Sequence, residues 1–186
     1  NNIIIQDNLN ITNNFSAHYG IDIVNTNFSI IKGNKLFGNF DNDNAYGLCS
    51  ACFEGIRLTA SSSNNSLQDN LVSNYHRGIY LQNVMGNYNK MWNNSFYDNL
   101  DYNAYAGIGT SDLIAFWNNS IIGNYWDDFE DNPGYSSGYY EIPGTYSTDY
   151  DIYYTDWHPI DLEDVYGCTN PDATNYNPDA TIDDGS

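Results

Sequence analysis

The sequence predicts an all-β fold, a right-handed single-stranded parallel β-helix (a solenoid of about five coils), from three features of the chain. An asparagine-centred unit recurs five times, and a short Gly-Ile strand follows each of the first four units. The units repeat with a period of about 25 residues, which together with short strands is typical of a β-solenoid.

The repeated unit consists of an apolar residue, two further positions, an Asn, an apolar pair and a second Asn. It occupies residues 5–13, 31–39, 67–74, 91–99 and 116–124. Because like residues stack on like in a solenoid, the first Asn of each unit is expected to join an amide ladder, donating to one neighbour and accepting from the other. The expected ladder residues are Asn8, Asn34, Asn70, Asn94 and Asn119.

The Gly-Ile strands begin at residues 20, 55, 78 and 107, and their glycines are expected at a second corner of the coil. Alternation along the first three strands predicts inward-pointing side chains at Ile21, Ile23, Ile56, Leu58, Ile79 and Leu81. The wide gap after the second unit predicts an inserted loop at 40–53, and 100–106 is expected to form a smaller bulge. A leucine-rich-repeat array shares the period, but the dense Leu framework is missing.

Charge divides the chain into unequal parts. The formal net charge is −19, with 24 acidic and 5 Lys or Arg residues, and every Lys and Arg falls within 1–124. We predict β-helix coils at 1–124, a Tyr/Trp-rich C-terminal cap at 125–160, and a short, irregular, acidic tail at 161–186.

The negative charge also restricts the partners. It disfavours nucleic acid, whose binding depends on Lys and Arg, and it repels anionic polysaccharides and membranes. Divalent cations, neutral glycans or a high-salt medium suit such a surface. The sequence contains no apolar run of about 18 residues, so no membrane insertion is expected. A start at Asn1 rather than Met is expected of a mature or excised segment.

The repeat is closed by NNSIIGNYWDDF at 118–129 and YYEIPGTYSTDYDIYY at 139–154. With the repeat, these segments resemble the NosD-like group of parallel β-helix surface proteins. The resemblance implies that Tyr125 and Trp126 cover the last open coil and that the stretch to Tyr154 folds over them. The chain departs from the group at 131–138, where the group often has a calcium-like run of Asp, and at 157–160, where Tyr-Pro-Leu is common.

The tail, YGCTNPDATNYNPDATIDDGS at 166–186, resembles a short module of secreted bacterial and archaeal proteins. That resemblance implies that Cys168 pairs with a Cys just beyond Ser186. Closely spaced Asp and Asn oxygens suit Ca²⁺, although these residue types also form turns. The predicted calcium ligands are Asp172, Asn175, Asn177, Asp179, Asp183 and Asp184.

Cys49 and Cys52 form a CxxC in the inserted loop. Without a second CxxC or a His pair nearby, a disulfide that staples the loop is favoured over a redox or metal site, and it fits an oxidising compartment. His18, His76 and His158 are scattered. Copper handling in one lineage of the NosD-like group makes a metal site the alternative to structural or solvent-facing roles.

Parallel β-helices also include polysaccharide lyases and epimerases, so a carbohydrate-active enzyme is the main alternative class. A lyase or epimerase needs a base with a cation beside it, and glycoside hydrolysis needs two facing carboxylates. Arg57 and Arg77 flank Gly-Ile strands in different registers, so no basic row is expected. Asp22 and Arg57 occupy matching positions one coil apart, which predicts an ion pair between coils.

The sequence therefore predicts an extracellular structural or adhesive glycoprotein of the cell surface, and favours a non-enzymatic role. Its candidate glycosylation sites are the sequons at Asn10, Asn14, Asn27, Asn64, Asn93 and Asn118. Homo-oligomers formed through the β-helix ends are expected to build a filament or array. The alternative is a lyase- or epimerase-like β-helix or a module that binds neutral glycans.

Overall fold

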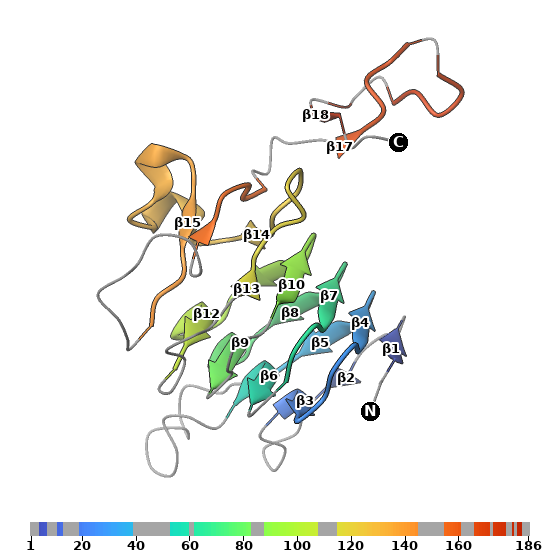
Figure 1. The fold of residues 1–186 in the computed structure, drawn as a ribbon. Coiled ribbons are helices and arrows are strands. Elements are labelled where there is room, and N and C mark those ends of the chain that lie inside the picture. Colours follow the sequence, from blue (N-terminus) through green and yellow to red (C-terminus); the bar gives the residue numbers. More distant parts are fainter. Residues whose placement is uncertain are drawn as a thin grey trace.

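Parallel strands form the body of the protein (Figure 1). The computed structural model describes residues 4–6, 11–12, 19–38, 53–59, 62–82, 88–107, 115–144, 155–160, 166–171, 173–177, 180 and 182–183. These residues contain no α-helix, and most of their strands belong to three parallel sheets. The all-β prediction, with parallel sheets, is confirmed.

The chain adds one strand to each sheet in turn before it returns to the first. Sheet 1 contains β1 (Ile4–Gln6), β4 (Ile30–Lys32), β7 (Ser66–Gln68), β10 (Asn89–Trp92) and β13 (Ala115–Phe116). Sheet 2 contains β2 (Ile11–Thr12), β5 (Lys35–Phe37), β8 (Leu71–Ser73), β11 (Ser95–Tyr97) and β14 (Tyr125–Trp126). Sheet 3 contains β3 (Tyr19–Val24), β6 (Glu54–Thr59), β9 (Arg77–Gln82) and β12 (Tyr102–Ala106).

Smaller elements follow the three sheets. Two 3₁₀ turns, η2 (Phe129–Asp131) and η3 (Tyr135–Ser137), precede an antiparallel pair of β15 (Tyr140–Glu141) and β16 (Thr155–Asp156). In the tail, β17 (Tyr166–Gly167) pairs in parallel with β18 (Ile182–Asp183). No helix in the described part of the chain has the length and apolar character that a membrane span requires.

The core lies between the sheets, where inward-pointing side chains stack in register. In sheet 3, Ile21 pairs with Ile56, which pairs in turn with Ile79. These and the other three inward positions expected from the Gly-Ile strands are all buried, as alternation predicts. Sheets 1 and 2 add their own stacks of fully buried apolar side chains, including Ile31, Leu36, Leu67, Val72, Met91 and Phe96. Each such side chain stabilises the fold by about 1.5–3 kcal/mol.

The last strand of sheet 3 differs from the one expected at Gly107. The strand is β12, which covers most of the stretch expected to bulge, and its Ala104 and Ala106 pair with Ile79 and Leu81. The bulge prediction is therefore wrong: 102–106 keeps the same alternation but uses Ala instead of Ile and Leu, which hides the repeat.

The glycines before the Ile residues serve close packing, not a left-handed turn. Gly55 is absent from the residues with positive φ, but a Cβ there would collide with Val72 and would lie 2.7 Å from the carbonyl oxygen of Gly78. Left-handed backbone occurs instead at other residues of the corners, such as Gly33, Asp69 and Asn93 between sheets 1 and 2 and Asn74 and Asp98 between sheets 2 and 3. Gly, Asp and Asn tolerate that conformation best.

An asparagine ladder runs along the interior, as the repeat predicts. Asn34 Nδ2 donates to Asn70 Oδ1 at 2.9 Å, and Asn70 Nδ2 donates to Asn94 Oδ1 at 2.9 Å. The other hydrogen of each amide returns to the chain, as in the 2.9 Å bond from Asn70 Nδ2 to the Ile31 carbonyl. All three side chains are buried, so their amides satisfy one another where water does not reach. Asn8, the first predicted member, lies outside the described residues.

The last member of the ladder is Asn124, and the prediction of Asn119 is wrong. Asn94 Nδ2 donates to Asn124 Oδ1 at 2.9 Å. Asn119 is exposed, and its Oδ1 accepts from the backbone N–H groups of Ile121 and Ile122 at 3.0 and 2.8 Å. Asn119 and Asn124 are the first and second Asn of the same repeat unit. The turn that Asn119 stabilises moves the ladder position from the first Asn to the second.

The ladder ends on a buried carboxylate, Asp156 of β16. Its Oδ2 accepts from Asn124 N at 2.7 Å, Asn124 Nδ2 at 3.1 Å and Trp126 Nε1 at 3.2 Å, and its Oδ1 accepts from His158 N at 3.1 Å. A carboxylate suits this place because the last amide of a ladder needs an acceptor only. Burial raises the pKa of Asp156 to about 7, although the four hydrogen bonds oppose the shift.

A second polar stack also ends on acids at the start of the cap. Asn99 Nδ2 donates to Asn103 Oδ1 at 2.8 Å. Asn103 Nδ2 in turn donates to Asp127 Oδ1 at 2.6 Å and to Asp128 Oδ1 at 2.7 Å. Carboxylates therefore close the C-terminal end of the sheets at two corners.

Aromatic rings close the same end of the core. Trp126 is 2% exposed and stacks between Phe96 and Tyr140, with ring centroids 4.8 and 4.3 Å apart. Trp117 packs against the same indole at 5.8 Å. Tyr125 and Trp126, expected to cover the last open coil, themselves form β14, the last strand of sheet 2, and residues 145–154, expected to fold over them, lie outside the described chain.

Candidate functional site

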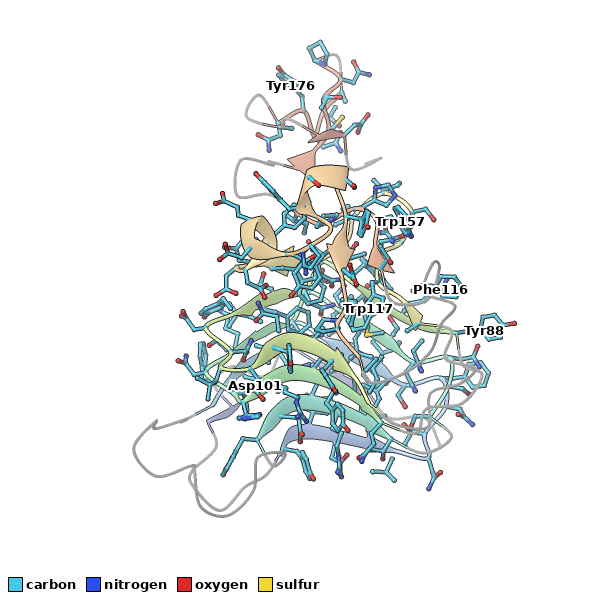
Figure 2. All side chains as sticks on the ribbon, turned by 90° about the vertical axis from the view of Figure 1, so that its left-hand side faces the viewer. Tyr88, Asp101, Phe116, Trp117, Trp157 and Tyr176 are labelled. Carbon is cyan, nitrogen blue, oxygen red and sulfur yellow. The ribbon has the colours of Figure 1, made fainter. Side chains whose placement is uncertain are left out.

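The outer face of sheet 3 gathers aromatic and charged side chains and faces the viewer in Figure 2. One row across the strands, set by the register, contains Asp22, Arg57, Tyr80 and Tyr105. A second row contains Tyr19, Glu54, Arg77 and Tyr102. Alternation places the first row on the outer face, opposite the buried Ile and Leu. The second row has the same parity as the buried Ile and Leu, but contacts from Tyr19, Arg77 and Tyr102 join it to the first row.

At one end of this face, Arg57 holds β3 and β6 together. Its Nη2 and Nε lie 2.6 and 3.0 Å from the two carboxylate oxygens of Asp22, a bidentate ion pair that confirms the predicted contact. Its Nη1 donates to Tyr19 Oη at 2.7 Å, and its guanidinium lies 3.6 Å from the centre of that ring. The hydrogen bond to Asp22 raises the pKa of Arg57. This arginine is fully engaged in structural contacts.

A buried carboxylate lies in the middle of the face. Glu54 is 1% exposed, and Arg77 Nη1 lies 3.5 Å from its Oε1. Burial raises the pKa of Glu54 to about 7, and the nearby Arg77 and Arg57 oppose the shift. Glu54 Oε2 and Arg77 Nε are buried without a hydrogen-bond partner. The group has the pKa of a general acid–base catalyst, but a bound molecule cannot reach it in this structure.

Three tyrosines occupy the other end, and we call Tyr80, Tyr102 and Tyr105 the tyrosine face. Tyr102 and Tyr105 stack with centroids 4.9 Å apart, and Tyr80 lies 5.8 Å from Tyr105. The guanidinium of Arg77 sits 4.8 Å from the ring centres of both Tyr80 and Tyr105. Tyr102 is 37% exposed, whereas the other two are half-buried. Burial raises the pKa of Tyr80. Arg77 orders the rings of Tyr80 and Tyr105, and Tyr102 stacks on Tyr105 to extend the aromatic surface.

His76 and Asp101 flank the tyrosine face. His76 Nε2 lies 3.1 Å from Asp101 Oδ2, and burial lowers the pKa of the histidine, with Asp101 opposing the change. Figure 2 shows Asp101 at the side of sheet 3. His76 therefore has a structural partner, as expected of it, whereas His18 lies outside the described residues. The backbone N–H of His158 donates to Asp156.

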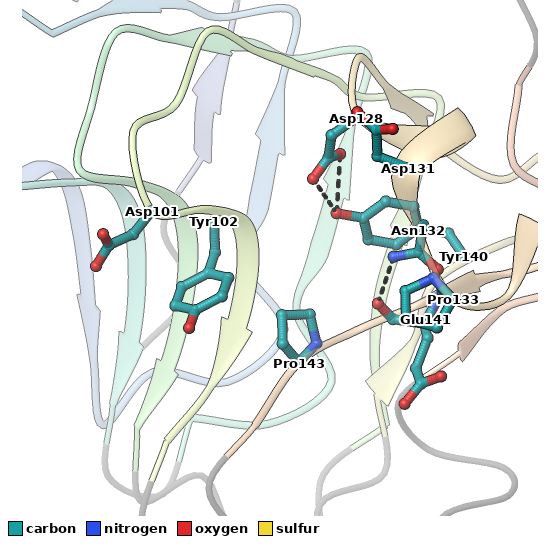
Figure 3. Close-up of a pocket in the computed structure, with 9 residues that line it drawn as sticks. All are labelled: Asp101, Tyr102, Asp128, Asp131, Asn132, Pro133, Tyr140, Glu141 and Pro143. Carbon is teal, nitrogen blue, oxygen red and sulfur yellow. Dashed lines mark hydrogen bonds between the residues drawn. The ribbon is translucent and has the colours of Figure 1, made fainter.

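A pocket of about 270 Å³ opens next to Tyr102, between β12 and the cap. Figure 3 shows the side chains that line it: Asp101, Tyr102, Asp128, Asp131, Asn132, Pro133, Tyr140, Glu141 and Pro143. Tyr140 Oη donates to both oxygens of Asp128 at 3.0 Å, which orders that wall. Asn132 bridges the other wall: its Nδ2 donates to the Glu141 carbonyl at 3.0 Å, and its Oδ1 accepts from the Glu141 N–H at 2.8 Å.

Only half of the predicted calcium ligands lie among the residues that the structure describes. Asp172, Asp179 and Asp184 lie outside them, while Asn175, Asn177 and Asp183 lie within the described tail. In the described part of the chain, no three His, Cys, Asp or Glu side chains are arranged to hold a metal ion. The calcium site stays a prediction.

The cysteines fall in two different parts of the chain. Cys49 and Cys52 lie outside the described residues, so their disulfide is untested. Cys168 follows β17 and has a buried, free thiol. Its backbone forms an isolated parallel β-bridge with Tyr176. Its partner beyond Ser186, implied by the resemblance, remains an expectation.

Four of the six sequons can be placed. Asn64 and Asn93 are exposed, whereas Asn27 and Asn118 are half-buried. Asn27 Oδ1 accepts from Ser63, and Asn118 Oδ1 accepts from the Ser120 N–H at 3.0 Å. Asn64 and Asn93 are thus the more accessible candidates. Asn10 and Asn14 lie outside the described residues.

Sequence reasoning missed the tyrosine face, the buried Glu54 and the pocket. The pattern Y-x-x-Y at 102–105 was the available signal, but it was hidden in the stretch expected to bulge. The pocket joins residues from β12 and the cap, a contact that the repeat alone does not specify.

The fold and the site define a class: an all-β protein with parallel sheets and an aromatic outer face. No family model, curated protein or solved structure matches the chain.

Proposed function

We propose that this chain is an extracellular adhesive module of the cell surface, a right-handed parallel β-helix of about five coils that binds neutral glycans through the tyrosine face. The three sheets support the helix, since successive strands pair in parallel while the chain passes from sheet to sheet. The asparagine ladder adds support, because like residues stack in a solenoid.

The observation that carries the binding proposal is the arrangement of Tyr80, Tyr102 and Tyr105. The face of an aromatic ring is partly negative and attracts the polarised C–H groups of a sugar ring. Arg77 orders Tyr80 and Tyr105, and Tyr102 stacks on Tyr105, so little side-chain entropy is lost on binding. The adjoining pocket supplies carboxylate and amide oxygens for sugar hydroxyls.

The same face argues against a lyase-like enzyme. Among the described residues of this face, Glu54 is covered and Arg57 and Arg77 are held in ion pairs, so none of these three side chains is open as the base or cation that proton abstraction from a uronate needs. Glu54 with its pKa of about 7 is the one feature in favour of catalysis. Unsaturated products from a panel of polyuronates, lost in Glu54→Gln, would establish the enzyme instead.

We also propose self-assembly through the β-helix ends, but only through the end that β1, β2 and β3 form. Trp126, Tyr140 and Asp156 cover the C-terminal end, so coils cannot stack there without removing the cap. The strands β1, β2 and β3 are the outer strands at the other end of their sheets. Contact between two copies would use that end, giving a closed pair in place of a filament. Light scattering at rising concentration tests this, and extended filaments would contradict it.

The glycan proposal predicts a loss of binding on the tyrosine face. Tyr102→Ala and Tyr105→Ala should each weaken binding to neutral oligosaccharides roughly tenfold, about 1.4 kcal/mol, because each removes a stacking surface. A glycan array identifies the ligand, and isothermal titration measures each variant. Tyr176→Ala is the control, since this exposed tyrosine lies in the tail, far from sheet 3 in Figure 2. Equal affinities in all three variants, or an array without binding, would rule out this role.

A further inference from the structure

One arginine connects the tyrosine face to a buried carboxylate. The guanidinium of Arg77 lies 4.8 Å from the ring centres of Tyr80 and Tyr105, and its Nη1 lies 3.5 Å from Glu54 Oε1. The register explains the contact with the acid, because Glu54 of β6 and Arg77 of β9 are partners in sheet 3. The carboxylate, the guanidinium and the two rings therefore form one connected cluster.

Glu54 is the only acid within ion-pair distance of Arg77 in the described part of the chain. The side chain of Arg77 is 13% exposed and that of Glu54 is 1% exposed, so water compensates neither charge fully. Arg77 Nε is also buried without a hydrogen-bond partner. A buried guanidinium that loses its counter-charge is costly, and a long arginine side chain can turn its head to solvent. Loss of the charge on Glu54 therefore favours positions of Arg77 away from the rings.

The strands packed against this ion pair carry further charged and titratable groups. They are Tyr19 and Asp22 on β3, Arg57 on β6, Tyr80 on β9, Tyr105 on β12, and Tyr75, His76 and Asp101 next to β9 and β12. Asp22 is held by Arg57 at 2.6 Å, and Asp101 by His76 at 3.1 Å. Burial lowers the pKa of His76, with Asp101 opposing the change. The histidine is therefore the neighbour whose titration has to be separated from that of Glu54.

We propose that Glu54 is the positioning residue of the tyrosine face and acts through Arg77. Its ionised carboxylate holds the guanidinium in place, and the guanidinium orders the rings. Burial raises the pKa of Glu54 to about 7, with Arg77 opposing the shift. Protonation near neutral pH then releases Arg77, so the affinity for a glycan falls as the pH falls through 7. The inference rests on the proposed glycan-binding function and gives that function a control by pH.

This pH dependence is opposite in sign to the effect of Glu54 on stability. A carboxyl whose pKa is raised in the folded chain makes the fold less stable as the pH rises, because the folded state holds its proton longer than the unfolded state does. The same ionisation strengthens binding in the proposed arrangement. A role of Glu54 in stability alone would not give tighter binding at higher pH.

The first measurement needs no ligand. In NMR spectra of the isotope-labelled chain from about pH 5 to 9, the Glu54 carboxyl carbon, the Arg77 Nε–H group and the rings of Tyr80 and Tyr105 should shift with one midpoint near 7. In Glu54→Gln the arginine and ring signals should stay at their low-pH positions throughout. This variant should keep the fold, because it removes a charge that burial disfavours.

Isothermal titration with the neutral N-acetylglucosamine tetramer adds the functional readout. Its affinity should fall about tenfold from pH 8 to pH 6, because the ionised fraction of Glu54 falls from about nine-tenths to about one-tenth. Glu54→Gln should bind about tenfold more weakly than the unmodified chain at pH 8 and show no pH dependence. Asp156→Asn is the matched control: it removes the other buried carboxyl with a pKa of about 7 and should keep the full pH profile.

The remaining outcomes separate this inference from the glycan proposal. Rings that do not follow the Glu54 carboxyl, or equal glycan affinity at pH 6 and pH 8, would overturn the positioning role and leave glycan binding intact. A pH profile that persists in Glu54→Gln and disappears in His76→Gln would assign it to the histidine and overturn the proposal as well. Rings that follow Glu54 in a chain that binds no glycan of the array would remove the glycan function and leave the contact through Arg77 established.

Discussion

Asn124→Ala should lower the free energy of unfolding by about 3–5 kcal/mol, one of the two largest effects expected in this chain. The side chain is fully buried and makes bonds in both directions. Its Oδ1 accepts from Asn94 Nδ2, and its Nδ2 donates to the carbonyls of Met91 and Trp117 and to Asp156. Alanine leaves these partners buried and unsatisfied, which costs more than the loss of exposed bonds.

Asn119→Ala is the matched control because both asparagines belong to the same repeat unit. Asn119 is exposed and accepts from two backbone N–H groups of a turn, so its loss should cost about 1 kcal/mol or less. Urea denaturation followed by circular dichroism gives both values. Equal effects, or a larger effect at Asn119, would place the ladder where the repeat alone predicts it and contradict the register described above.

Asp156 should make the fold less stable as the pH rises from about 5 to 8. Burial raises the pKa of this carboxyl to about 7, above its value of roughly 3.9 in the unfolded chain. Between these values the folded state binds the extra proton, so the free energy of unfolding falls as pH rises through 7. The contribution is on the order of a few kcal/mol. Glu54, with a pKa of about 7, acts in the same direction.

Substitutions at Asp156 separate the charge from the hydrogen bonds. Asp156→Asn keeps an acceptor for Asn124 and Trp126 and removes the ionisation, so its melting temperature should depend less on pH than that of the unmodified chain. Asp156→Ala leaves four donors without an acceptor and should cost about 3–5 kcal/mol at every pH. Scanning calorimetry between pH 5 and 8 measures both. An Asn variant with the full pH dependence would show that Asp156 does not titrate in this range.

The repeat predicts much of the body of the fold because stacking makes like positions neighbours. Asn34, Asn70 and Asn94 form the expected ladder, and Asp22 pairs with Arg57 as their matching positions indicate. These contacts need only the period and the alternation of a strand, both of which are written in the sequence.

The errors arise where loops or substitutions change the register. The turn at Asn119 displaces the ladder to Asn124, and nothing in that unit distinguishes the two asparagines beforehand. In β12, Ala104 and Ala106 occupy positions that Ile and Leu fill in earlier strands, so the strand was mistaken for a bulge. Local pattern gives no reason to choose between such registers.

Contacts between the cap and the sheets were not predictable, since they join segments with no shared pattern. Asp156 meets Asn124 across more than 30 residues, and nothing around it marks a buried acid. The pocket depends in the same way on Tyr102 lying beside the cap. Such sites follow from the packed structure and not from the repeat.

The most direct test of the central claim is an NMR titration of the isotope-labelled chain with a neutral oligosaccharide chosen from the array. Resonance shifts are expected to concentrate on Tyr80, Tyr102, Tyr105 and the pocket-facing residues of the cap. Shifts on the outer faces of sheets 1 or 2, or no shifts at millimolar ligand, would contradict a glycan-binding role for the tyrosine face.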